Sequence, residues 1–275
     1  MKRIISCVFL VLSSCMFSPK GNQTDSNVIE EIKPSLLLVG YANDVPIFRD
    51  FNSENLYYFN GEFKYYMKGK QGFAPVYCND SVFIYVALED KKFFSNEVII
   101  TKGQSEKKVI LPHKVSGLVS NMNGDTLFYT NGDNEVDRIR IFDVTEKKEV
   151  LGIYAWYEGF WYSKGKFYYY IFDEEEDRSY IYTTSVPPIE KGILITNTSV
   201  DNMSAISYDG NYLSGSEKFS EKLYCVVSLK TGEFKRVVLE MDYSSAIFSF
   251  FYKNKAYFYH PSTLEIKATI SLEDI

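Results

Sequence analysis

The chain has 275 residues, of which 45% are hydrophobic and 17% aromatic, with 23 tyrosines and 21 phenylalanines. This composition can fill the core of one large domain, and it favours strands, because aromatic side chains pack well on pleated, half-buried surfaces. The net charge is −6, and a mildly acidic chain without a basic face argues against nucleic acid as a partner. We therefore expect a mainly β protein that binds no nucleic acid.

The first residues have the features of a secretory leader. Residues 2–12 are a basic pair followed by an apolar run that is too short to span a bilayer but suits a signal peptide. The run ends in Leu-Ser-Ser-Cys at Cys15, which resembles the lipobox of bacterial lipoproteins, in which the cysteine is lipidated. We predict a signal peptide over 1–14, then a lipidated cysteine and flexible tether over 15–26 that attach the protein to a bacterial membrane. The alternative is an ordinary secretory leader with a chance cysteine.

Two kinds of turn then alternate along the chain. The first has a glutamate, usually followed two residues later by lysine, at Glu62, Glu106, Glu146, Glu190, Glu233 and Glu265, in steps of 44, 40, 44, 43 and 32 residues. The second is rich in Asn, Asp and Gly, at 42–44, 78–80, 123–125, 163–165, 208–210 and 252–254. Residues of the second kind tolerate the left-handed backbone of a two-residue hairpin turn.

Each full repeat therefore predicts four antiparallel strands. The clearest predicted strands lie over 115–122, 126–129, 139–142, 148–151, 166–172, 180–182, 212–214 and 223–227. A repeat of this length predicts an all-β fold, a β-propeller with six four-stranded blades in one domain over 27–275, with five blades as the alternative. The glutamate and lysine strands would form the outer blade edges, where charge discourages aggregation.

The last repeat is too short for four strands. Only 11 residues separate Asn254 from Glu265. A ring of blades must close, so we predict that 28–32, or failing that 36–40, supplies the missing strand. A three-stranded last blade is the fallback.

The lipobox at Cys15 and the repeats over 36–275 together resemble the TolB-like six-bladed propeller lipoproteins of bacterial cell envelopes. The resemblance is one of architecture, because the sequence boxes of other propeller families are absent. It implies an envelope location, periplasmic or surface-facing, and a binding or scaffolding role. It assigns no catalytic residue.

The best candidate ligand site is a cluster of aromatic residues over 154–162. It contains both tryptophans, Trp156 and Trp161, together with Tyr157 and the acidic Glu158. Exposed on a propeller face, these side chains would stack on a sugar ring or anchor a protein partner. The alternative is that they are buried between blades.

Enzymatic chemistry has less support in the sequence. The predicted inner strands over 72–79, 115–122, 203–208 and 244–251 contain no Asp or Glu. A glycan hydrolase or lyase is the alternative function, with loop carboxylates at the channel mouth drawn from Glu158, Asp201 or Asp242. The chain has two histidines and no cysteine pair with metal-ligand spacing, so we expect neither metal nor cofactor. Cys78 and Cys225 fall in different predicted blades and are expected to be free and buried.

Overall fold

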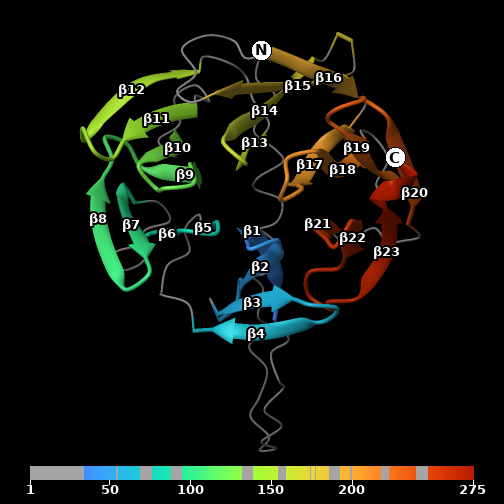
Figure 1. Ribbon diagram of the computed structural model, residues 1–275, viewed down its shortest axis with the longest axis horizontal. Coiled ribbons are helices and arrows are strands. Elements are labelled where there is room, and N and C mark those ends of the chain that lie inside the picture. Colours follow the sequence, from blue (N-terminus) through green and yellow to red (C-terminus); the bar gives the residue numbers. More distant parts are fainter. Residues whose placement is uncertain are drawn as a thin grey trace, which may run out of the picture. The chain divides into compact units, whose positions relative to one another are not determined.

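Strands joined by turns make up nearly all of the described chain. The computed structural model (Figure 1) describes residues 34–53, 55–68, 76–87, 95–131, 139–153, 159–173, 175–176, 178–185, 193–198, 200–217, 223–239 and 247–275. These residues belong to one compact part, Lys33–Ile275. In them the one helical element is a short 3-10 turn, η1 (Leu272–Asp274). The predicted leader, tether and first candidate closing strand, 28–32, lie outside the described residues.

The first eight strands form one sheet in the order β4-β3-β2-β1-β5-β6-β7-β8. They are β1 (Leu36–Ala42), β2 (Val45–Asp50), β3 (Leu56–Phe59), β4 (Phe63–Met67), β5 (Val76–Cys78), β6 (Phe83–Val86), β7 (Glu97–Lys102) and β8 (Ser105–Ile110). Each half is an antiparallel meander, and the halves meet in one parallel pairing, between Gly40 and Cys78. The sheet is therefore two four-stranded units side by side.

Three separate four-stranded sheets and one three-stranded sheet follow. The first contains β9 (Val115–Ser120), β10 (Thr126–Asn131), β11 (Ile139–Asp143) and β12 (Lys148–Ile153). The second contains β13 (Gly159–Ser163), β14 (Lys166–Asp173), β15 (Arg178–Ser185) and β16 (Ile193–Thr198). The third contains β17 (Val200–Ile206), β18 (Tyr212–Glu217), β19 (Leu223–Ser228) and β20 (Phe234–Val238). The last contains β21 (Phe248–Tyr252), β22 (Lys255–Tyr259) and β23 (Ile266–Ser271).

The first strand of each unit lies innermost, around a common axis (Figure 1). These innermost strands contact one another in turn: β1 with β5, β5 with β9, β9 with β13, β13 with β17, β17 with β21, and β21 with β1. Antiparallel sheets arranged radially around a channel define a β-propeller. We number the units 1 to 6 in chain order, starting at β1, β5, β9, β13, β17 and β21. The blade count itself stays a prediction, because β1 and β5 join the first eight strands in one sheet.

The segment 36–40 does not supply a strand to the last sheet. It belongs to β1, which pairs with β2 on one side and meets β5 on the other. The reason is local, because the tight turn at Asn43 and Asp44 folds β1 directly onto β2. Among the described residues the last sheet has three strands. Its completion by 28–32 stays a prediction.

Aromatic rings fill the space between neighbouring units. Phe128 of unit 3 stacks on Phe167 of unit 4 with centroids 4.5 Å apart, and Phe48 of unit 1 meets Phe250 of unit 6 edge to face at 5.1 Å. All four rings are fully buried. The high aromatic content is therefore explained by packing between sheets, where large rings bury much surface.

The predicted strands over 115–151, 166–172, 180–182, 212–214 and 223–227 are confirmed, with ends that shift by a few residues. The turns that follow the innermost strands differ more. Those of units 1, 4 and 6 are two-residue turns with both residues at positive φ. Those of units 2, 3 and 5 are longer, because a side chain caps each turn by accepting a backbone N–H: Asn79 from Ser81, Asn121 from Asp125, and Ser207 from Asn211.

Candidate functional site

The innermost strands surround a cavity of about 240 Å³. Residues of β1, β5, β9, β13 and β17 and of the turns after them line it. Those of β9 and its turn are aliphatic side chains and Met122, whereas the other strands supply aromatic rings and hydroxyl groups, among them Tyr77, Trp161, Tyr162, Ser204 and Tyr208. Aromatic walls with a few polar groups are typical of ligand pockets. The channel is therefore the candidate site that the fold builds.

The turns that follow the innermost strands are expected to gather at one end of the channel. β1 and β5 run parallel to each other, and each innermost strand continues into the next strand of its unit through such a turn. We call these turns the inner hairpins, and their end of the channel the hairpin end. Charged residues in the inner hairpins thereby approach one another although they are far apart in sequence.

Four of these charged residues are carboxylates, and one of them, Asp125, belongs to the inner hairpin of unit 3. Asp44, Asp80 and Asp209 come from the inner hairpins of units 1, 2 and 5, and Lys164 comes from unit 4. Partial burial raises the pKa of the Asp44 carboxyl; Asp209 and, more weakly, Asp80 raise it further, whereas Lys164 lowers it. The hairpin end therefore carries a partly compensated negative charge.

Tyr208 lies across the hairpin end. Its hydroxyl donates a hydrogen bond of 2.5 Å to Asp80 Oδ2, and the Lys164 Nζ lies 3.8 Å from the centroid of its ring. The ring also contacts that of Tyr41, with centroids 6.3 Å apart. The contact with the Tyr208 hydroxyl raises the pKa of Lys164 and so favours its charged form.

Further hydrogen bonds link neighbouring units near this end. The Asn43 backbone N–H donates to Asp80 Oδ1 at 2.7 Å. The Ser163 hydroxyl donates to the Tyr208 carbonyl at 2.7 Å, and the Phe251 N–H donates to the buried Tyr41 hydroxyl at 3.0 Å. Burial raises the pKa of Tyr41, which keeps this phenol protonated. The polar groups of the inner hairpins therefore bond between units as well as within their own turns.

Trp161 is the one predicted ligand residue that falls within the described residues. It lies on β13, lines the cavity, and stacks on Tyr170 with centroids 5.7 Å apart. It is half-buried against the core between units 4 and 5, whereas its neighbours Phe160 and Tyr162 pack toward unit 3. This alternation follows from the strand, whose successive side chains point to opposite faces. Trp161 therefore packs between two units and also lines the cavity, and its role in ligand binding stays a prediction.

The other predicted residues are not brought into this site by the described structure. Trp156, Tyr157 and Glu158 lie outside the described residues, as do Cys15 and Asp242. Asp201 is the second residue of β17, because this innermost strand of unit 5 begins at Val200 and not at the predicted residue 203.

Sequence reasoning missed Asp80, Lys164 and Tyr208 as site residues. All three were recognised as parts of recurring tight turns, but only as turns. The available signal was the repeat itself, because the same hairpin of every blade lies at the same end of a propeller. Charges in such a repeat are therefore candidates for one shared site.

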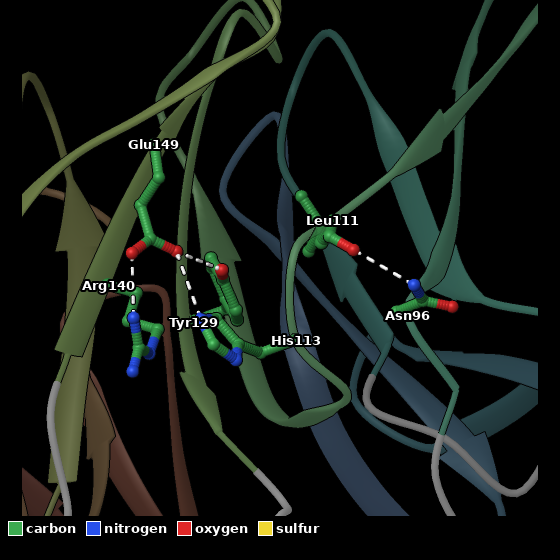
Figure 2. Close-up of polar contacts among 6 residues, drawn as sticks. All are labelled: Asn96, Leu111, His113, Tyr129, Arg140 and Glu149. Atoms are coloured by element: carbon green, nitrogen blue, oxygen red, sulfur yellow. Dashed lines mark hydrogen bonds and ion pairs between the residues drawn. The ribbon is translucent and has the colours of Figure 1, made fainter.

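A second polar cluster lies in unit 3 (Figure 2). Glu149 of β12 accepts hydrogen bonds from the Tyr129 hydroxyl at 2.6 Å and from Arg140 at 2.7 Å, and His113 Nε2 lies 4.0 Å away. Burial raises the pKa of Tyr129, and the hydrogen bond to Glu149 raises it further. The cluster ties β10, β11 and β12 to the connection before β9. We interpret it as structural.

In the same connection, the Asn96 side chain donates a hydrogen bond of 2.9 Å to the Leu111 carbonyl (Figure 2). Cys78 and Cys225 form no disulfide bond, and both are buried, as expected. Within the described ranges, no three His, Cys, Asp or Glu side chains are grouped so that they could hold a metal ion. In that part of the chain, no helix has the length and apolar character needed to cross a membrane.

No protein family matches the sequence, and no curated protein does. Solved structures match the fold. Kluyveromyces lactis Hsv2 has a TM-score of 0.54 at 14% identity, over 82% of this chain and 71% of that chain. Hsv2 with its loop 6CD replaced by a Gly-Ser linker has a TM-score of 0.53 at 12% sequence identity, over 86% of this chain and 100% of that chain.

A prolyl endopeptidase structure gives a TM-score of 0.50 at 15% identity, over 66% of this chain but only 31% of its own. The matched parts of these structures are β-propellers. At such low identity the likeness concerns the fold alone. The protein is therefore an all-β propeller.

Proposed function

We propose that the protein is a lipid-anchored β-propeller of a bacterial cell envelope, and that it binds a protein or glycan ligand at the hairpin end without performing chemistry. One observation carries the binding role: the channel cavity joins an aromatic lining to a charged rim. Aromatic faces stack on sugars and anchor protein side chains, and rim charges steer and orient a ligand. The propeller likenesses agree with a binding or scaffolding role in general.

A binding screen of the full chain against envelope glycans and envelope proteins tests this role. Trp161→Ala removes one aromatic ring of the cavity lining, and Lys164→Gln removes the exposed rim cation with little effect on folding. We expect each to weaken ligand binding by about 10-fold, the size of one well-packed interface contact. Tyr66→Ala, an exposed aromatic on the outermost strand β4, is the matched control and should bind normally.

Binding that survives both channel variants and is lost in Tyr66→Ala would move the site to the outer surface. Because Trp161 also packs against Tyr170, thermal unfolding of Trp161→Ala must accompany the assay. Lys164→Gln keeps the test decisive if the tryptophan variant unfolds.

The anchor is proposed from Cys15 and from the resemblance to TolB-like envelope lipoproteins. Cys15→Ser should lose incorporation of labelled fatty acid and move from the membrane fraction to the soluble envelope fraction. Retention of both label and membrane association in Cys15→Ser would contradict the anchor.

One observation favours the alternative, a glycan hydrolase or lyase. Asp44, Asp80 and Asp209 place carboxylates at the channel mouth, and the pKa of Asp44 is raised, as a general acid requires. Product release from envelope glycans that is abolished in Asp44→Asn and kept in Asp173→Asn, which changes the carboxylate at the end of β14, would establish it.

A further inference from the structure

The Tyr208–Asp80 hydrogen bond joins opposite sides of the ring. Tyr208 follows β17, which contacts β13 and β21, whereas Asp80 follows β5, which contacts β1 and β9. Unit 2 and unit 5 are therefore three places apart in either direction round the six innermost strands. The bond crosses the axis, unlike the contacts between neighbours described above.

The groups of this crossing also form one wall of the cavity. Asp80, Lys164 and Tyr208 all line it. Lys164 lies over the ring, and Tyr41 packs against it. A ligand that approaches from the hairpin end therefore meets Tyr208 before it reaches Trp161 and the rest of the aromatic lining.

We propose that the Tyr208 side chain is a movable bar that closes the hairpin end of the channel, and that breaking its bond with Asp80 opens the cavity. This regulation rests on the proposed function in one respect, namely that the ligand enters at this end. A ligand that binds the open state better than the closed state shifts the population toward it.

The backbone of the turn that carries Tyr208 is held by hydrogen bonds that do not involve the Tyr208 side chain. Ser163 donates to the Tyr208 carbonyl at 2.7 Å, and Ser207 bonds across the turn with Tyr212 through its backbone N–H and its hydroxyl. The side chain itself is half-buried and is fixed by the hydroxyl bond and by ring contacts. Rotation about its own bonds therefore opens the channel without moving β17.

The chain contains a natural reporter of opening. Cys78 lines the cavity, on the strand that leads to Asp80, and is 6% exposed. Cys225 is 0% exposed in the core between units 4 and 5 and does not line the cavity. A small uncharged thiol reagent such as methyl methanethiosulfonate should reach Cys78 through the opened channel, but Cys225 only when the core itself opens.

The test measures labelling rates of both cysteines in the folded full chain, located by peptide mass spectrometry. Tyr208→Phe keeps the ring but loses the bond to a carboxylate, so Cys78 should label about 10-fold faster while Cys225 is unchanged. Lys164→Gln removes the cation over the ring and its contact with the Tyr208 hydroxyl but keeps the Tyr208–Asp80 bond, and we expect about a threefold increase. Tyr180→Phe is the control, because it also loses a tyrosine bond to a carboxylate, that of Glu176, outside the channel.

Unchanged Cys78 labelling in Tyr208→Phe would overturn the bar. Equal acceleration of Cys78 and Cys225 in both channel variants would also overturn it, since the bond would then stabilise the fold and not the closed channel. The measurement needs no ligand, so its failure is separate from a failure of the binding screen.

Discussion

The two rims of the sheets carry similar polar residues but use them differently. At the outer rim, Lys64 pairs with Glu62 at 2.9 Å and Lys267 with Glu265 at 2.6 Å, each within its own strand start. At the inner hairpins, Asp80 bonds to unit 1 and to unit 5. Two sequence repeats of nearly equal period therefore have unlike roles. The outer repeat keeps strand edges polar, and the inner repeat couples the units.

One contact at the outer rim also links two units. Lys235 of the outermost strand β20 pairs with Asp274 of η1 in the next unit at 2.7 Å. Both partners are largely exposed, and exposed ion pairs contribute little to stability. We therefore expect substitutions at the inner hairpins to lower the stability of the protein more than substitutions at the outer rim. Pairs of variants at the two rims test this expectation.

The largest difference is expected between two glycines. A Cβ at Gly40 would lie 2.0 Å from the Cys78 carbonyl oxygen, where β1 meets β5, and the residue has φ +150°. Gly40→Ala must push these strands apart and should destabilise the protein by about 3 kcal/mol or more, lowering Tm by about 10 °C.

Gly103, in the turn between β7 and β8, is the matched outer position. Its φ is also positive, at +58°, but a Cβ there meets nothing within 4 Å. Gly103→Ala should cost only about 1 kcal/mol, from backbone strain alone. Equal losses of Tm in the two variants would contradict the proposed coupling through β1 and β5.

The next largest effect concerns the hydroxyl of Tyr41. Tyr41→Phe leaves the Phe251 N–H without its acceptor between units 6 and 1, and a buried unpaired donor costs about 1 to 3 kcal/mol. Unfolding in denaturant measures this loss as a decrease in the free energy of unfolding. Tyr180→Phe, which breaks a bond inside one exposed hairpin, should leave the denaturation midpoint nearly unchanged. A larger loss of stability in Tyr180→Phe than in Tyr41→Phe would contradict the proposed difference between the two rims.

Asp44 gives a smaller effect that depends on pH. Its pKa is raised above its ordinary value of 3.8, so the folded state holds the proton more tightly than the unfolded chain. The Asp44 carboxylate therefore lowers stability as the pH rises from 3.8 through the folded pKa, and below that window the penalty vanishes.

Asp44→Asn should accordingly raise Tm at pH 7 by about 1 °C more than it does at pH 3, allowing for screening at this exposed turn. Any gain from asparagine in the left-handed backbone is the same at both pH values. A difference of the opposite sign would show that the inner rim stabilises the Asp44 charge.

The smallest effect is expected at the outer rim. Lys64→Gln removes an exposed ion pair within one turn and should change Tm by less than about 1 °C in scanning calorimetry. Lys235→Gln, whose partner is in the next unit, is the closest outer counterpart of the inner contacts. A loss there as large as that of Tyr41→Phe would show that the outer rim also couples the units.

Local patterns in the sequence predicted the strands well. Alternation and turn residues identified β9 to β12, because both act over a few residues and need no distant partner. The fallback prediction that 36–40 completes the last sheet was wrong for the same reason. The tight turn at Asn43 and Asp44 pairs β1 with the adjacent strand β2. Pairing with the last sheet would have required a contact more than 200 residues away.

The site was less predictable for the same reason. Tyr208 and Asp80 are 128 residues apart, and nothing in either hairpin indicates that the other faces it across the channel. Trp161 could be recognised as a candidate from its residue type, but its position between units 4 and 5 depends on which face of β13 meets unit 5. The contact between Tyr208 and Asp80 and the position of Trp161 are determined only when the sheets close into a ring.

Closure itself has a consequence for how the protein folds. The Tyr259 hydroxyl donates to the Leu36 carbonyl across 223 residues, and both side chains are fully buried. Neither can be covered until nearly the whole chain has been arranged around the axis. Contacts of such separation slow folding, because the chain must be ordered before they form. The junction between the first and last sheets is therefore expected to limit the folding rate, and a newly made chain would keep aromatic surface open to water until that junction forms.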